Sequence, residues 1–162
     1  MQAGDILLFV GQKVFIDEAI EYETSSKYTH AALAISETEY VEAWWSGVRK
    51  AELNPNDPRK FDIYTTITPL TDLQKAEITG FALGKIGEEY NFLQLIGFPV
   101  EKLFHTDKNV LGSTHKVICS QLVIQSYKAV GIVLLPNIEE YSVAPSDLAN
   151  SKLLRQEGLA CQ

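Results

Sequence analysis

Cysteine is scarce in this sequence: among 162 residues only Cys119 and Cys161 occur, and they lie far apart. Two distant cysteines do not provide the framework of a disulfide-stabilised secreted domain. A structural zinc site is not expected either, because the only Cys or His within four residues of Cys119 is His115. We therefore expect no disulfide scaffold, no metal site and no cofactor.

Long apolar runs and basic residues are also lacking. No apolar run approaches the ~20 residues that a membrane-spanning helix needs. The first eleven residues carry no basic segment, and Asp5 interrupts their apolar stretch, unlike a secretory signal. The 14 Lys and Arg are outnumbered by 21 Asp and Glu, which gives a net charge of -7 and repels phosphate groups. We expect no transmembrane segment, no nucleic-acid partner and a cytoplasmic location; the oligomeric state stays open.

The composition that is present belongs to a globular protein. Hydrophobic residues make up 46% of the chain and charged residues 22%, so a sizeable core is expected rather than disorder. The length suits one core and is short for two ordinary domains. With no repeat, linker or low-complexity tract, residues 1–162 are predicted to form a single domain.

The order of local patterns predicts an α+β fold with an antiparallel sheet. Short runs of β-branched and aromatic residues predict strands within 4–11, 29–36, 39–47, 48–53 and 60–67. Helical spacing and end signals predict helices over 14–25, 70–87 (capped by Thr71 or Asp72), 88–98 and 115–131, and a short one from Pro145. The polar residues 101–116 are predicted to form a loop that flanks the site.

Cys119 occupies the first turn of the helix predicted over 115–131. Gly131 ends that helix, and its apolar residues recur at helical spacing in Leu122, Val123, Tyr127 and Val130. The backbone N–H groups of a helix N-terminus favour the thiolate and so make cysteine a better nucleophile. The alternative is that Cys119 is a small buried hydrophobic residue, as most free cysteines are.

His30 and Glu42 fall on two strands predicted to be neighbours in a hairpin. Such strands bring cross-strand side chains within reach of a carboxylate–imidazole hydrogen bond. Glu42 lies within the apolar run VEAWW, where a buried carboxylate needs a partner. The alternatives are a core histidine with its hydrogen bonds satisfied and a glutamate on the solvent face. His105 and His115 lie in the predicted loop and are expected to be solvated.

Several segments together resemble a known superfamily, over the stretch from Gly4 to about Ser151. They are, in order, GDILLF, THAALAI, VEAWWSGV, GKIGEEYNF, ICSQLVIQSYKAVG and PSDLANS. The set looks like the circularly permuted branch of the NlpC/P60 superfamily, the YiiX/YaeF-like group of papain-like cysteine hydrolases. Lecithin:retinol acyltransferase-like proteins are its more distant kin. The resemblance implies a permuted papain-like fold, with an antiparallel sheet packed against helices and the nucleophile at a helix N-terminus.

By position, the resemblance assigns Cys119 as nucleophile, His30 as general base and Glu42 as the residue that orients the imidazole. It implies a cysteine peptidase or amidase that cleaves an amide bond in a small peptide, which can be cell-wall-derived, although this chain carries no wall-binding module. Asp5 matches the Gly-Asp opening, with an expected structural role. Two alternatives remain: acyl transfer or thioester cleavage on a lipid, and a non-catalytic binding module.

Two finer expectations concern the cleft. The backbone N–H of Cys119, at the expected helix start, is predicted to be the first oxyanion donor. Tyr90 is expected either to pack in the core or to line the cleft, with its hydroxyl directed at the thiol or the scissile carbonyl. The tryptophan pair Trp44–Trp45 can line an acyl groove or pack in the core.

Overall fold

The fold is taken from a computed structural model of the chain. It describes residues 1–11, 27–44, 47–54, 56, 59–87 and 109–157. The helices predicted over 14–25 and 88–98 lie outside the described residues, as do Tyr90, His105 and Cys161.

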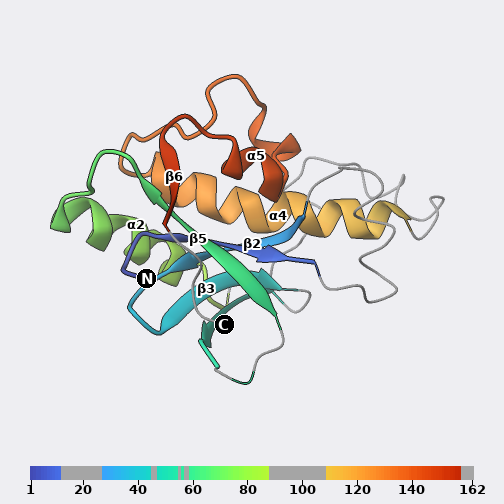
Figure 1. Cartoon of the computed structure of the whole chain (residues 1–162), viewed down its shortest axis with the longest axis horizontal. Helices are drawn as coiled ribbons and strands as arrows, with labels where there is room; N and C mark the ends of the chain where they lie inside the picture. Colours follow the sequence, from blue (N-terminus) through green and yellow to red (C-terminus); the bar gives the residue numbers. More distant parts are fainter. Residues whose placement is uncertain (12–26, 45–46, 55, 57–58, 88–108, 158–162) are drawn as a thin grey trace.

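A six-stranded antiparallel sheet forms the centre of the molecule (Figure 1), in the order β4-β3-β2-β1-β5-β6. The strands are β1 Ile6–Val10, β2 Tyr28–Ala34, β3 Glu39–Trp44, β4 Gly47–Glu52, β5 Lys60–Thr66 and β6 Leu154–Glu157. The first five confirm the sequence-based prediction. The sixth was not foreseen, because it is a short edge strand of which only the first residue, Leu154, is buried.

Both faces of the sheet are buried, as the alternation of side chains along β1 makes clear. One face packs against the helices in the larger cluster, which includes Ile6, Leu8, Ala31, Leu33, Val41, Leu122, Val123 and Tyr127. The other face holds a second, smaller cluster that includes Leu7, Phe9, Ala32, Ala34, Tyr40 and Ile63. Burial on two sides explains why β1 reads as the nearly continuous apolar run ILLFV.

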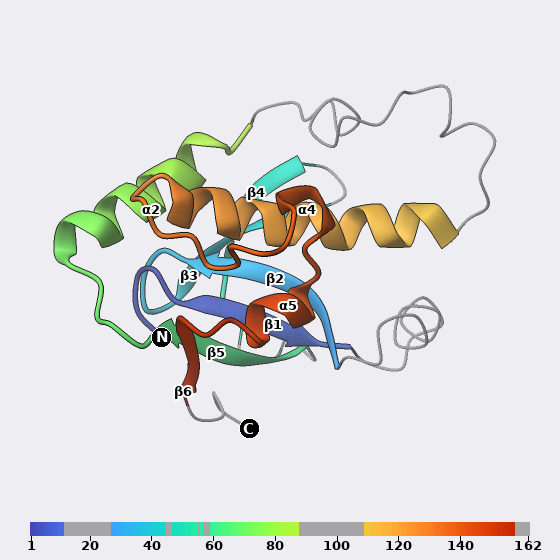
Figure 2. The same ribbon diagram turned by 90° about the horizontal axis from the view of Figure 1, so that it is seen from above.

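The helices lie over the first face, and Figure 2 shows α4 running across the sheet with α2 beside it. They are α2 Asp72–Gly84, α4 Asn109–Lys128, the short 3₁₀ helix η2 Glu140–Ser142 and α5 Pro145–Ala149. A capping box settles the start of α2, because the Thr71 hydroxyl accepts from the backbone N–H of Gln74, whose side chain accepts from the N–H of Thr71. Pro145 begins α5, as predicted. An α+β fold with helices packed on an antiparallel sheet is therefore confirmed.

The start of α4 corrects one prediction. The helix begins at Asn109, ten residues before Cys119, so Cys119 lies in its middle and not in its first turn. Residues 109–116 were predicted as part of a polar loop because the stretch 101–116 is mostly polar. Within it, Gly112, Ser113 and Thr114 are weak helix formers. None of the residues 109–118 is a proline, however, so no residue there forbids a helix. Activation of Cys119 by a helix N-terminus is accordingly wrong.

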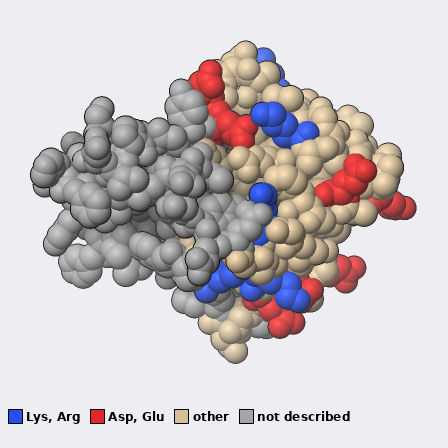
Figure 3. Space-filling view, turned by 180° about the vertical axis from the view of Figure 1, so that it is seen from behind, with Lys and Arg blue, Asp and Glu red and all other residues tan. Residues whose placement is uncertain are grey.

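None of the helices in the described part of the chain is long and apolar enough to span a bilayer. The surface seen in Figure 3 carries charges of both signs, interspersed over its described part without gathering into one basic area. A continuous basic stripe, the usual mark of a nucleic-acid-binding face, is thus missing from the described part of that face.

Candidate active site

His30 lies on β2, beside an irregularity in the ladder with β1. His30 pairs with Phe9 and Tyr28 pairs with Val10, which leaves Thr29 without a partner in that register. Such bulges redirect neighbouring side chains and are common next to active sites. The imidazole is buried, with 7% of the residue exposed, and Nε2 makes a 2.8 Å hydrogen bond with Oε2 of Glu42.

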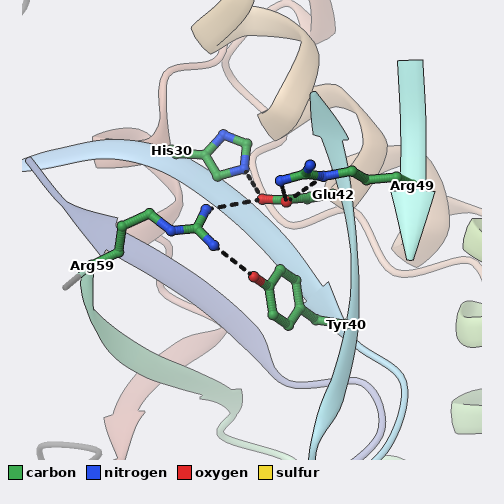
Figure 4. Close-up of polar contacts among 5 residues, drawn as sticks. All are labelled: His30, Tyr40, Glu42, Arg49 and Arg59. Carbon is green, nitrogen blue, oxygen red and sulfur yellow. Dashed lines mark hydrogen bonds and ion pairs between the residues drawn. The ribbon is translucent and has the colours of Figure 1, made fainter. Parts of the chain in front are cut away.

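Glu42 lies in the middle of β3 and is completely buried. Its Oε1 accepts two hydrogen bonds from one guanidinium, from Nε of Arg49 at 2.9 Å and from Nη2 at 2.6 Å. On the other oxygen, Nη1 of Arg59 lies 3.6 Å from Oε2, and Nη2 of Arg59 donates to the Tyr40 hydroxyl at 3.0 Å. Figure 4 shows the imidazole and the two guanidiniums converging on this carboxylate.

Aromatic rings enclose this polar group. The ring of Phe9 lies 5.5 Å from that of His30, and Trp44 meets the imidazole edge-on at 5.6 Å between centroids. The guanidinium of Arg49 lies over Trp44 at 4.3 Å, and that of Arg59 lies over Phe9 at 4.9 Å. Cations over ring faces are held by the negative quadrupole of the ring, so the same aromatics fix both the imidazole and the arginines.

Cys119 reaches this group from α4. Its side chain is buried in the larger cluster, close enough to His30 for its hydrogen bond and its charge to act on the imidazole. Because Nε2 is bonded to Glu42, Nδ1 is the ring nitrogen left for the thiol. The structure thus brings together Cys119, His30 and Glu42, which the sequence assigned to one site.

The electrostatics of the group favour a protonated imidazole. Burial alone lowers the pKa of His30, but the charge and hydrogen bond of Cys119, followed by those of Glu42, raise it to about 9. For Glu42, burial raises the pKa, yet His30 and then Arg49 outweigh that effect and hold the pKa below its usual range. The two shifts act in the same sense: they favour an imidazolium bound to an ionised carboxylate.

Two other expectations about the site meet different outcomes. In the interior of an α-helix, a backbone N–H is bonded to the carbonyl four residues earlier, so the N–H of Cys119 is not the free oxyanion donor that was expected. Tyr90 lies outside the described residues, and its role stays a prediction.

The sequence analysis missed Arg49 and Arg59. A signal for Arg49 was present: β3 ends at Trp44 and β4 begins at Gly47, so a hairpin register pairing these two places Arg49 directly opposite Glu42. Gly47 has a φ of 113°, a conformation that favours glycine and marks the turn. Arg59 offered no comparable signal, because it lies before β5 and reaches Glu42 across two strands.

Comparison with known proteins gives a fold but no family. No protein-family model matches this chain, and no curated protein matches it. Among solved structures, it resembles a crystal structure described as "metalloprotein yiiX from Escherichia coli O157:H7, DUF1105". The two are 18% identical, with a TM-score of 0.66, over 98% of this chain and 97% of the other. The chain therefore has a YiiX-like fold.

Proposed function

We propose that this protein is a cysteine hydrolase in which Cys119 is the nucleophile, His30 the general base and acid, and Glu42 the residue that orients the imidazole. The observation that supports it most is the placement of His30, which is bonded to Glu42 through Nε2 and lies close enough to Cys119 for the thiol to act on its pKa. A nucleophile, a base within hydrogen-bond reach and a third group that fixes the base are the parts that thiol hydrolysis requires.

The proposed reaction has two steps. The Cys119 sulfur attacks the carbonyl carbon of an amide, and the imidazolium of His30 gives its proton to the leaving nitrogen as the C–N bond breaks. The product is an acyl thioester and a free amine. His30 then takes a proton from water, whose oxygen attacks the thioester carbon, and the C–S bond breaks. The acid leaves, and the thiolate–imidazolium pair is restored.

The raised pKa of His30 supports this mechanism in place of the helix N-terminus. Burial lowers the pKa of His30, but Cys119 and Glu42 together raise it to about 9, so the imidazole holds the proton that the leaving nitrogen needs. Both Cys119 and Glu42 are 0% exposed, so the carboxylate–imidazole bond is shielded from water. Substrate access to the sulfur requires the residues that cover it to move aside.

The same burial favours a second candidate function, a non-catalytic module in which the three residues are a polar part of the core. A buried hydrogen-bonded network can fix one packing arrangement without any chemistry. This candidate predicts a thiol that does not react, and Glu42 with its arginines then serves stability alone.

The proposed substrate is a small peptide with a scissile amide, as the resemblance to papain-like hydrolases implies; a cell-wall-derived fragment fits this class. An acyl lipid or thioester remains the alternative implied by the lecithin:retinol acyltransferase-like kin. A cytoplasmic location also stays a proposal.

The similar structure is described as that of a metalloprotein, yet the candidate site here does not fit a metal ion. Among the described residues, no three His, Cys, Asp or Glu side chains are placed to hold one. Within the site, both oxygens of Glu42 accept hydrogen bonds, and the charge of Arg49 repels a second cation. The proposed reaction accordingly includes no metal step.

The test is a comparison of Cys119→Ala with wild type on short fluorogenic peptide amides and on the matching esters and thioesters. The control variant is Ser126→Ala, which removes a buried polar side chain from the same helix, where its hydroxyl donates to the carbonyl of Leu122. We expect turnover to vanish in Cys119→Ala and to persist in Ser126→Ala. Turnover that survives in Cys119→Ala contradicts the proposal, and a wild type inert to every substrate favours the non-catalytic module.

A further inference from the structure

We propose that Arg49 is a positioning residue for the candidate site: it holds one oxygen of Glu42 so that the other oxygen is presented to His30. The expected effect of Arg49 on catalysis rests on the proposed function. Its expected effect on the orientation and ionisation of Glu42 rests on the geometry alone. Arg49 thereby has a role in the reaction without contact to substrate or sulfur.

The division of the two carboxylate oxygens is the first argument. Nε and Nη2 of Arg49 both donate to Oε1, at 2.9 and 2.6 Å, whereas Nε2 of His30 binds Oε2 at 2.8 Å. Two donors from one rigid, planar guanidinium fix the carboxylate in rotation as well as in position. With Oε1 so held, the orientation of Oε2 is fixed as well: it faces the imidazole, and Nη1 of Arg59 lies 3.6 Å from the same oxygen.

The backbone supplies the second argument. Glu42 and Arg49 are direct partners in the β3–β4 ladder, so the contact is set by strand register and needs no long-range loop. Trp44, two residues after Glu42, lies under the guanidinium of Arg49 and meets the imidazole of His30 edge-on. Arg49 is thus held from below by the ring that also limits the tilt of His30.

Charge is the third argument. Burial favours the neutral form of a carboxyl group, so each cation beside Glu42 helps to keep it ionised: His30, Arg49 and, 3.6 Å from Oε2, Arg59. A protonated Glu42 no longer stabilises an imidazolium. The side chain of Arg49 is 42% exposed, whereas that of Glu42 is completely buried. The guanidinium therefore loses little hydration when it binds the carboxylate. The arrangement keeps Glu42 ionised at a pH where a buried carboxyl is otherwise protonated.

The test compares Arg49→Met and Arg49→Lys with Lys50→Met as the matched control. Lys50 is the next residue of β4, is similarly exposed and pairs with Glu39 on the surface. Two readouts are needed: the pH dependence of iodoacetamide alkylation at Cys119, and the titration of Glu42 followed by carbon NMR of the labelled carboxyl. Neither readout requires a known substrate.

In Arg49→Met we expect the carboxyl of Glu42 to titrate at least one pH unit higher than in wild type. We also expect the acid limb of the alkylation profile to move upward by a similar amount, so that at a pH on that limb the rate is about tenfold lower. Arg49→Lys should recover the position of the acid limb, because it keeps the charge, but only part of the rate, because an ammonium lacks the planar pair of donors. With a turned-over substrate, kcat should fall and KM should change less than twofold. Lys50→Met should match wild type throughout.

A folded Arg49→Met whose profile and Glu42 titration match those of wild type overturns the inference. If Arg49→Met does not fold, the double variant Glu42→Gln/Arg49→Met is compared with Glu42→Gln. Both of these proteins lack the buried charge of the Glu42 carboxylate, so loss of Arg49 leaves no unpaired charge in the core. If Arg49 acts through Glu42, its removal from the Glu42→Gln protein causes no further loss of the alkylation rate. An additional tenfold drop in that rate contradicts the proposed role. Failure of the hydrolase proposal looks different: wild-type Cys119 then reacts no faster than the thiol in His30→Ala, while the shift of Glu42 in Arg49→Met is still measurable.

Discussion

His30 and Glu42 are hydrogen-bonded although they are not opposite each other in the sheet. Glu42 pairs with Ala32, and His30 lies two residues earlier on the same strand, so the 2.8 Å contact is a diagonal one. Diagonal neighbours on one face of a sheet are about 7–8 Å apart at the backbone, within reach of long side chains. The glutamate therefore reaches past its direct partner to bind the imidazole.

Reactivity of the thiol should depend on His30. Iodoacetamide at pH 6 should alkylate Cys119 at least tenfold faster in wild type than in His30→Ala, because the imidazolium stabilises the thiolate. Peptide mapping by mass spectrometry separates Cys119 from Cys161, and equal rates at Cys119 in the two proteins count against a catalytic thiol.

Exchange of Glu42 for glutamine should leave some activity, whereas His30→Ala should leave none. A glutamine has one acceptor oxygen in place of two. Its NH₂ group therefore faces another donor, which is either the His30 N–H or the guanidinium of Arg49. Leaving one of those donors unsatisfied costs about 1–3 kcal/mol, and we expect kcat/KM to fall by ten- to a hundredfold. Glu39→Gln, on the same strand but in a surface ion pair with Lys50, is the control. Unchanged activity in Glu42→Gln removes Glu42 from the site.

Stability should fall as the pH rises from 6.5 to 9. The pKa of His30 is about 9 in the folded protein against 6.5 for an ordinary histidine, so the folded state holds this proton more tightly than the unfolded chain does. The resulting stabilisation is fully present below pH 6.5 and is lost as the pH passes through 9; it amounts to about 3 kcal/mol at most. Urea unfolding at pH 6, 7.5 and 9 measures it. His30→Gln should lack this pH-dependent part, and an identical decline in that variant assigns the effect to other groups.

Tyr90→Phe tests the cleft role of Tyr90. If the ring packs in the core, kinetics should be unchanged and stability should fall by at most ~1 kcal/mol, the net contribution of one hydrogen bond. If the hydroxyl faces the reacting group, the melting temperature should be normal and kcat/KM should fall about tenfold or more, equivalent to ~1.4 kcal/mol. Lower stability with full activity removes Tyr90 from the site.

The sequence predicts the first five strands well because each is short and bounded by turn residues. The run ILLFV and the alternation in YTHAALA are local signals, and each strand then pairs with a neighbour close by in the sequence or with β1. The start of α4 is a different case. Its first turns contain weak helix formers, and a helix there depends on extension from the strongly apolar part around Leu122 and Val123. Tertiary context of that kind is absent from a local pattern.

For the candidate site, the contact between His30 and Glu42 is predictable because an isolated carboxylate in an apolar strand demands a partner. One partner does not satisfy such a carboxylate. A completely buried carboxylate with two oxygens accepts several hydrogen bonds, and Arg49 supplies two of them. The contact of Arg59 with Glu42 depends on where the chain enters β5, and that place is determined only when the sheet is assembled.

The order of the strands and helices along the chain also determines when the proposed site is completed during synthesis. Residues 6–66 contain β1 to β5, with His30, Glu42 and Arg49, whereas Cys119 follows on α4. A ribosome therefore produces the base and its supporting residues well before the nucleophile. The thiol meets its base only when α4 docks onto the finished strands, so a nascent chain or a truncated product that ends before α4 carries no activated cysteine. Reactivity of the cysteine is in this way tied to completion of the fold.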